Sequence, residues 1–142
     1  MFPPALILRS IYKMVEEMNK LTSPVFTPKP WGSEIMWSLT DHYMAKTIEL
    51  DPLKIGDLVV YEYKEKSIIV VENTLVLGLG SCCEEDDLEY AEYPEGWSVY
   101  IAPGQLHRYG STDKSVRIVE ISSPQLDEAI VVSKVDELKL EG

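Results

Sequence analysis

The chain has 142 residues, of which 45% are hydrophobic, so it is long enough for one core and too short for two comfortable domains. Its 24 acidic residues outnumber its 13 basic residues, which gives a formal charge of −11. This charge opposes nonspecific binding to nucleic acid or to an anionic membrane, because phosphate groups need Lys and Arg to displace their counterions. We therefore expect neither as a partner.

Residues 1–23 predict an amphipathic α-helix. Pro3 and Pro4 stand where a helix would begin, and Ser23-Pro24 ends the helical pattern. The apolar run at residues 5–8 is too short for a membrane span or a signal peptide, so we expect a cytoplasmic protein. The apolar face of the helix is expected to pack on the rest of the chain or on a second subunit. That face consists of Ile7, Ile11, Met14, Val15, Met18 and Leu21.

The remainder, residues 24–142, is predicted to be one all-β domain. Short runs of β-forming residues follow one another after Trp31-Gly32, with Gly, Pro, Asp and Asn between them. Many short strands with frequent turn signals and no second long helix indicate a β-sandwich or barrel. The predicted strands are residues 34–39, 43–50, 58–63, 67–72, 74–79, 88–93, 97–101, 116–122 and 129–133.

Two features before residue 88 are predicted to have no binding role. Cys82 and Cys83 are adjacent, which is unsuitable for a disulfide and lacks the ligand spacing of a zinc site. Two free thiols fit a reducing compartment. The acidic run at residues 84–87 lacks the spacing and the glycine of a calcium loop, so we expect a solvated loop there.

The most specific segment is a strand that ends in a Pro-Gly turn and is followed at once by a histidine. Trp97, Val99 and Ile101 alternate with more polar positions, which predicts a strand with one face in a core. Pro103-Gly104 forms the turn, and His107 opens the next strand, where a ring nitrogen could point into a cavity. The other histidine in the chain lies in a predicted surface turn, at His42.

These strands and this turn resemble a cupin, a double-stranded jelly-roll barrel whose second motif runs from a glycine through Pro-x-Gly to a histidine. Gly96, Gly104 and His107 match that motif, and Ala102 stands where the proline is usual. Within the cupins, the chain resembles the type II mannose-6-phosphate isomerase domain that is often fused to mannose-1-phosphate guanylyltransferase. This resemblance covers residues 26–132 and rests on residues 29–34, 44–50 and 116–122.

The resemblance implies a divalent metal (Zn, Mn, Ni or Fe), held by the first cupin motif together with the final histidine. The metal would act as a Lewis acid at a sugar carbonyl while a neighbouring base moves a proton. This sequence departs from the family in the first motif. One register places Val59 and Tyr61 at the glutamine and histidine positions, and Lys66 at the position of the glutamate ligand.

A second register starts from Gly56 and places Glu62 and Lys64 at the two histidine positions. Both registers leave His107 as the only standard ligand. We therefore expect no cofactor, with His107 as the metal ligand only if a metal binds. In the family, an arginine follows an acidic pair in the C-terminal tail, and in this chain Val132 stands near the expected position of that arginine. Lys29, Lys46 and Arg108 remain as candidate phosphate-binding groups.

The candidate catalytic residues are His107, Lys66 and Glu62, and the candidate ligand-binding residues also include Tyr61, Tyr63 and Arg108. Lys66 has two interpretations. Inside the barrel, its ammonium would occupy the place of the metal and attract an anionic or hydroxyl-bearing ligand. Alternatively, Lys66 is a solvated turn residue with no binding role. The two tyrosines either offer hydroxyls to a ligand or fill the core. His107 either contacts a ligand or is a hydrogen-bonded barrel histidine without metal.

Two functions follow from these residues. The first is a cupin with a degenerate metal site that binds a small molecule or carbohydrate in its barrel and lacks standard isomerase activity. The second is an active sugar-phosphate isomerase or epimerase with an atypical site around His107. Because cupins commonly pair through exposed sheet edges, a homodimer is expected from the resemblance.

Overall fold

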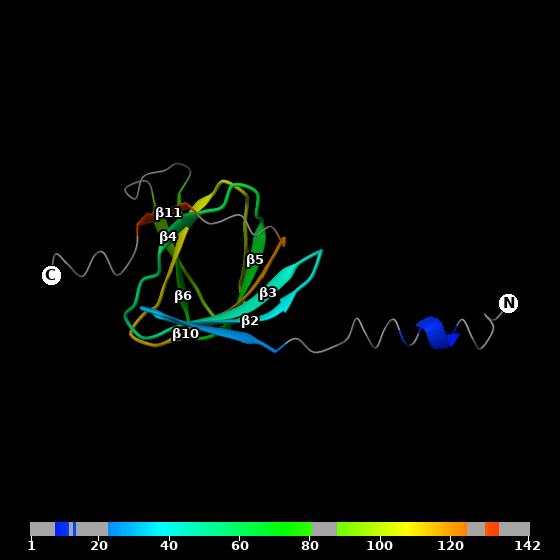
Figure 1. Cartoon of the computed structure of the whole chain (residues 1–142). Helices are drawn as coiled ribbons and strands as arrows, with labels where there is room; N and C mark the ends of the chain where they lie inside the picture. Colours follow the sequence, from blue (N-terminus) through cyan, green and yellow to red (C-terminus); the bar gives the residue numbers. More distant parts are fainter. Residues whose placement is uncertain (1–7, 12, 14–22, 81–87, 125–129, 134–142) are drawn as a thin grey trace.

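A computed structural model describes residues 8–11, 13, 23–80, 88–124 and 130–133, and these form two antiparallel β-sheets that enclose a barrel (Figure 1). Residues 8–11 and 13 have helical backbone, and the side chains of Leu8 and Ile11 are exposed. Within the described ranges, no helix has the length and apolar character needed to cross a membrane. The all-β prediction is confirmed.

The first sheet has six strands. Their order across the sheet is β1 (Val25–Lys29), β2 (Gly32–Leu39), β3 (Met44–Leu50), β10 (Val116–Ser122), β5 (Lys66–Glu72) and β8 (Ser98–Ile101). The second sheet has five strands, in the order β11 (Ile130–Ser133), β4 (Leu58–Val60), β9 (Leu106–Gly110), β6 (Leu75–Gly80) and β7 (Glu89–Tyr93). Beyond β3 the chain passes repeatedly from one sheet to the other, which is how a jelly roll winds.

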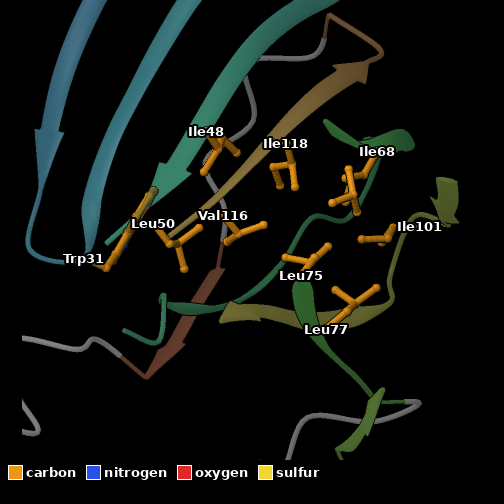
Figure 2. Packing of buried hydrophobic residues seen from close by; sticks show 10 residues of the cluster. Trp31, Ile48, Leu50, Ile68, Leu75, Leu77, Ile101, Val116 and Ile118 are labelled. Carbon is orange, nitrogen blue, oxygen red and sulfur yellow. The ribbon is translucent and has the colours of Figure 1, made fainter. Parts of the chain in front are cut away.

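Alternation along the strands places apolar side chains between the two sheets. In β5, Ile68 and Val70 are 1% and 2% exposed, whereas Ile69 between them is 42% exposed. Burial of the alternate residues is the main stabilising contribution, at roughly 1.5–3 kcal/mol for each large apolar side chain. Side chains from both sheets meet in one cluster (Figure 2), made of Trp31, Ile48, Leu50, Ile68, Val70, Leu75, Leu77, Ile101, Val116 and Ile118.

All nine predicted strands overlap strands of the structure, with differences at their ends. The predicted strand at residues 58–63 ends early, at Val60, so Tyr61 follows β4 rather than lying within it. The edge strand β1 was not predicted, because Pro28 within it cannot donate a hydrogen bond and disfavours a strand assignment.

The expectation that Trp97 shares the core face of its strand is wrong. Its side chain is 61% exposed, because β8 begins only at Ser98. Trp97 instead belongs to the turn that precedes the strand, where its backbone N–H donates to the backbone carbonyl of Pro94 at 3.1 Å. The predictions for Cys82, Cys83, the acidic run at 84–87, the side chain of Val132 and most of the N-terminal helix concern parts of the chain outside the described residues.

Candidate functional site

A cavity of about 170 Å³ lies inside the barrel and is lined by both sheets. Its wall combines apolar residues of the core with titratable side chains from five strands of the first sheet. Tyr109 of β9 and the segment around β4 complete it. The lining residues are Lys29, Trp31, Glu34, Lys46, Ile48, Leu50, Gly56, Asp57, Val59, Tyr61, Lys66, Tyr109 and Glu120.

Glu120 is the centre of a buried polar cluster in this wall. The Lys66 Nζ atom lies 2.9 Å from Glu120 Oε1, and the Lys46 Nζ atom lies 3.4 Å from Oε2. The Tyr109 hydroxyl donates to Oε1 at 2.5 Å, which connects the two sheets. We call Lys46, Lys66, Tyr109 and Glu120 the lysine–glutamate cluster. At its outer side, Lys46 Nζ also lies 3.5 Å from Glu34 Oε1.

Strand register explains why these side chains meet. Glu120 in β10 lies opposite Lys46 in β3, and Ser122 two residues later lies opposite Lys66 in β5. Side chains that are opposite or diagonal on one face of antiparallel strands are within reach of each other when they are long. The central position of β10 in the first sheet therefore places one carboxylate between two lysines.

The cluster holds Glu120 as a carboxylate. Burial alone would raise the pKa of this carboxyl group, but the ammonium groups of Lys66 and Lys46 and the hydrogen bond from Tyr109 outweigh burial and lower it well below its usual range. Burial and the Glu120 carboxylate raise the pKa of Tyr109 well above its usual value. Tyr109 therefore remains a neutral phenol that donates a hydrogen bond to the Glu120 carboxylate.

The pKa values of the two lysines in the cluster are shifted in opposite directions. Burial disfavours the ammonium of Lys46, but the carboxylates of Glu120 and Glu34 together outweigh burial and raise the pKa of Lys46. Burial is decisive at Lys66, and the positive charges of Lys46 and Lys64 add to it, so the pKa of Lys66 is lowered. Lys46 is thus the firmly charged partner and Lys66 the one that loses its proton more readily.

His107 lies in β9 beside the cluster and is 1% exposed. Its Nδ1 atom is 2.9 Å from the carbonyl oxygen of Gln105, which can only accept, so Nδ1 carries the proton and Nε2 is the acceptor. Within the described residues, Nε2 has no hydrogen-bond partner. Burial, reinforced by the charge of Lys66, lowers the pKa of His107 to about 3, and the ring is therefore neutral near pH 7.

Tyr61 stands between the lysines and the histidine. Its ring centroid is 4.7 Å from Lys66 Nζ and 5.0 Å from Lys64 Nζ, distances that suit cation–π contacts. The ring also stacks against His107 with the centroids 6.1 Å apart. Tyr61, Lys66 and His107, which the sequence selects as candidate ligand-binding residues, are therefore brought together.

The other sequence candidates lie elsewhere. Glu62 and Tyr63 are exposed, with Tyr63 at 63%. Arg108 is 2% exposed and donates from Nε to the carbonyl of Gly56 at 2.9 Å. Since side chains alternate along β9, Arg108 points to the opposite face from His107 and Tyr109. Of the candidate phosphate-binding groups, Lys29 and Lys46 line the cavity.

Sequence reasoning missed Glu120, Tyr109 and Glu34. The sequence does contain a signal for Glu120. It follows Val116 and Ile118 at every second position of β10, so it is on the same buried face of the strand. The same parity argument places Lys66 with Ile68 and Val70, so that an inward lysine on β5 is a buried residue rather than a solvated turn residue.

The side chains in the barrel do not suit the divalent metal that the resemblance implies. In the described part of the chain, no three His, Cys, Asp or Glu side chains lie close enough together to hold a metal ion. The oxygens of Glu120 already bind two ammonium groups, and Tyr61 and Tyr109 flank His107. An ammonium close to a metal position also repels the cation.

Comparisons with known proteins bear on the fold. No family model and no curated protein sequence matches the chain. Among solved structures, KdgF from Halomonas sp. aligns with a TM-score of 0.61 and 16% identity over 72% of this chain and 90% of KdgF. Bacillus subtilis oxalate decarboxylase OxdC aligns with a TM-score of 0.65 and 9% identity over 77% of this chain.

The capsular polysaccharide assembling protein CapF from Staphylococcus aureus aligns with a TM-score of 0.61 and 17% identity over 74% of this chain. The chain spans 30% of the oxalate decarboxylase and 32% of CapF. At such identities the similarity shows the fold alone, and that fold is the cupin jelly roll. The cupin prediction is confirmed at this level, and the resemblance to mannose-6-phosphate isomerase stays a prediction.

Proposed function

We propose that this cupin barrel binds a small hydroxyl-bearing molecule of the carbohydrate type, and that the lysine–glutamate cluster organises the site in place of a metal. The observation that carries the proposal is the Lys66–Glu120 pair, which is buried and yet forms part of the cavity wall. Replacing a buried ion pair by well-packed apolar residues is often neutral or stabilising, so stability alone does not explain these charges in the cavity wall. A binding role explains them.

The remaining polar atoms suit hydroxyl groups. Trp31 lines the cavity, and its Nε1–H has no hydrogen-bond partner within the described residues. A hydroxyl accepts from such a donor and simultaneously donates to a carboxylate such as Glu34 or Glu120. The ring of Tyr61 offers an apolar surface for a C–H-rich face of the ligand. At about 170 Å³ the cavity is smaller than the pockets of drug-sized ligands, which favours a small ligand.

This proposal places ligand recognition ahead of isomerisation centred on His107. A general base works best when its pKa is near the operating pH, and burial lowers the pKa of His107 to about 3. The neutral ring is better suited to accept a hydrogen bond at Nε2 than to remove a proton from carbon. The protein is therefore proposed to lack standard metal-dependent isomerase activity.

A thermal-shift screen in the presence of a chelator tests the proposal. The panel contains neutral monosaccharides, their alditols, sugar acids and sugar phosphates. A ligand present at about 100 times its Kd stabilises the folded state by about 2.7 kcal/mol, which gives a clear rise in Tm. The rise is expected to disappear in Lys66→Met and to persist in Glu49→Gln, which changes an exposed ion pair outside the cavity. No rise with any class of ligand, or a rise that requires added metal, would overturn the proposal.

A further inference from the structure

We infer that Lys66 is a nucleophilic amine that forms a reversible imine with a small aldehyde or ketone in the barrel. This inference rests on the proposed function, since it assigns the ligand to the carbonyl-bearing members of the same hydroxylated class. The geometry that points to it is a cavity-lining lysine that shares one carboxylate with a second, more firmly charged lysine.

The first element of this geometry is position. Lys66 is 4% exposed, and it lines the cavity. Its Nζ atom is 4.7 Å from the ring centroid of Tyr61 and 5.3 Å from that of Tyr109. Burial removes water from the charge of Lys66, and this desolvation favours the amine form.

The second element is the partner lysine. Lys46 and Lys66 occupy the two oxygens of the Glu120 carboxylate, and Lys46 also reaches Glu34. Lys46 therefore keeps its positive charge and disfavours a second positive charge close by. A lysine that is desolvated and adjacent to another cationic group is one of the ways in which an amine is activated at neutral pH. Burial and Lys46 both lower the pKa of Lys66 accordingly.

The reaction balances with the groups present. The Nζ lone pair forms a bond to the carbonyl carbon while the C=O π electrons move to oxygen. One proton passes from Nζ to that oxygen by way of the Glu120 carboxylate, and a second proton is taken up from solvent. The C–O bond then breaks, water leaves, and a protonated imine remains. The protonated imine carries one positive charge, as the Lys66 ammonium does before it loses its proton, so it can pair with Glu120 as the ammonium does. Neither an oxidant nor a reductant is required.

Reductive trapping tests the inference on the whole wild-type chain. The protein is incubated at pH 7 with D-erythrose and sodium cyanoborohydride, which reduces imines to stable amines, and the modified lysines are mapped by peptide mass spectrometry. Each unit by which the pKa of Lys66 lies below that of an exposed lysine raises its amine fraction about tenfold. Because the pKa of Lys66 is lowered, more modification is expected at Lys66 than at the exposed Lys114. Equal modification of the two lysines, or none at Lys66, overturns the inference.

A matched pair of variants tests the role of Lys46. Lys46→Arg keeps the neighbouring positive charge and is expected to retain trapping at Lys66. Lys46→Met removes the charge, so the pKa of Lys66 rises and trapping is expected to decrease. Equal trapping in both variants contradicts this role. Should Lys46→Met fail to fold, the wild-type map and Lys46→Arg still decide the outcome.

Erythritol separates this inference from the proposed function, because it has the hydroxyl groups of erythrose and no carbonyl. A rise in Tm with erythritol but no erythrose adduct at Lys66 leaves the binding function intact and overturns the imine. An adduct at Lys66 without any effect of erythritol supports the imine and counts against recognition through hydroxyl groups.

Discussion

Lys66 and Glu120 form an ion pair inside the barrel, with Nζ 2.9 Å from Oε1 and side chains that are only 4% and 3% exposed. The pair joins β5 to β10 on the inner face of the first sheet. Because neither charge is well solvated, each depends on the other and on Lys46 and Tyr109. The stability of the barrel and the chemistry of the cavity are thus linked through the same four side chains.

Loss of the central carboxylate is expected to destabilise the fold strongly. Glu120→Gln leaves two lysines without their shared negative charge, and breaking a buried pair in this way costs about 3–5 kcal/mol. The free energy of unfolding, obtained from urea denaturation, measures the effect. Glu49→Gln is the matched control, because Glu49 pairs with Arg117 at 3.3 Å on the exposed face and its loss costs at most about 1 kcal/mol. Equal losses in the two variants would contradict the buried cluster.

The contributions of Lys66 and Glu120 to stability are expected to be non-additive. Lys66→Met and Glu120→Gln each leave a buried charge with fewer partners, whereas the double variant removes both members of the pair. The double variant should therefore be more stable than the sum of the single losses predicts, by about 0.5–3 kcal/mol. Urea denaturation of the four proteins of this cycle gives the coupling directly. An additive result would mean that the two side chains do not interact.

Part of this site was predictable from the sequence. The His107 turn and the strand pattern predict the cupin barrel, and the parity of Lys66 with Ile68 and of Glu120 with Ile118 identifies both as inward residues. The pairing of Lys66 with Glu120 was not predictable, because it depends on β10 lying between β3 and β5. That order is set by contacts between strands far apart in the chain, which local patterns do not record. The exposed position of Trp97 was missed because the strand begins one residue later.

Acid is expected to destabilise the protein through His107. Burial lowers the folded-state pKa of His107 from 6.5 to about 3, so between these values the unfolded chain binds a proton that the folded protein does not. The contribution of the neutral His107 ring to the free energy of unfolding is therefore fully present above pH 6.5. It is lost as the pH falls toward 3, by up to about 1.4 kcal/mol per pH unit.

His107→Gln should reduce this dependence of stability on pH, whereas His42→Gln on the exposed turn before β3 should leave it unchanged. Denaturation curves at intervals between pH 4 and pH 7, a range that runs from above the expected window into its lower half, provide the measurement. A wild-type slope that His107→Gln does not change would show that the ring is not held neutral in the folded state.

The turn before His107 is expected to require glycine. Gly104 has a φ of +78°, and its N–H donates to the carbonyl of Tyr61 at 2.7 Å, which attaches the turn to a residue of the cavity. Gly104→Ala should cost about 1–2 kcal/mol, because a Cβ is unfavourable in the left-handed region. Gly110→Ala is a suitable control, since φ there is not positive and an added Cβ meets its nearest neighbour at 3.5 Å. Thermal unfolding of both variants distinguishes backbone strain from added volume; equal losses would contradict the strain.

The lysine–glutamate cluster is proposed to organise ligand binding in the barrel in place of a metal. The most direct measurement is a calorimetric titration of the chelator-treated protein with the ligand that gives the largest thermal shift, repeated after the addition of Mn²⁺ or Zn²⁺. We expect one ligand to bind per chain with the same affinity in both titrations, and binding to be lost in Lys66→Met. Binding that occurs only after metal is added, or that survives in Lys66→Met unchanged, would contradict it.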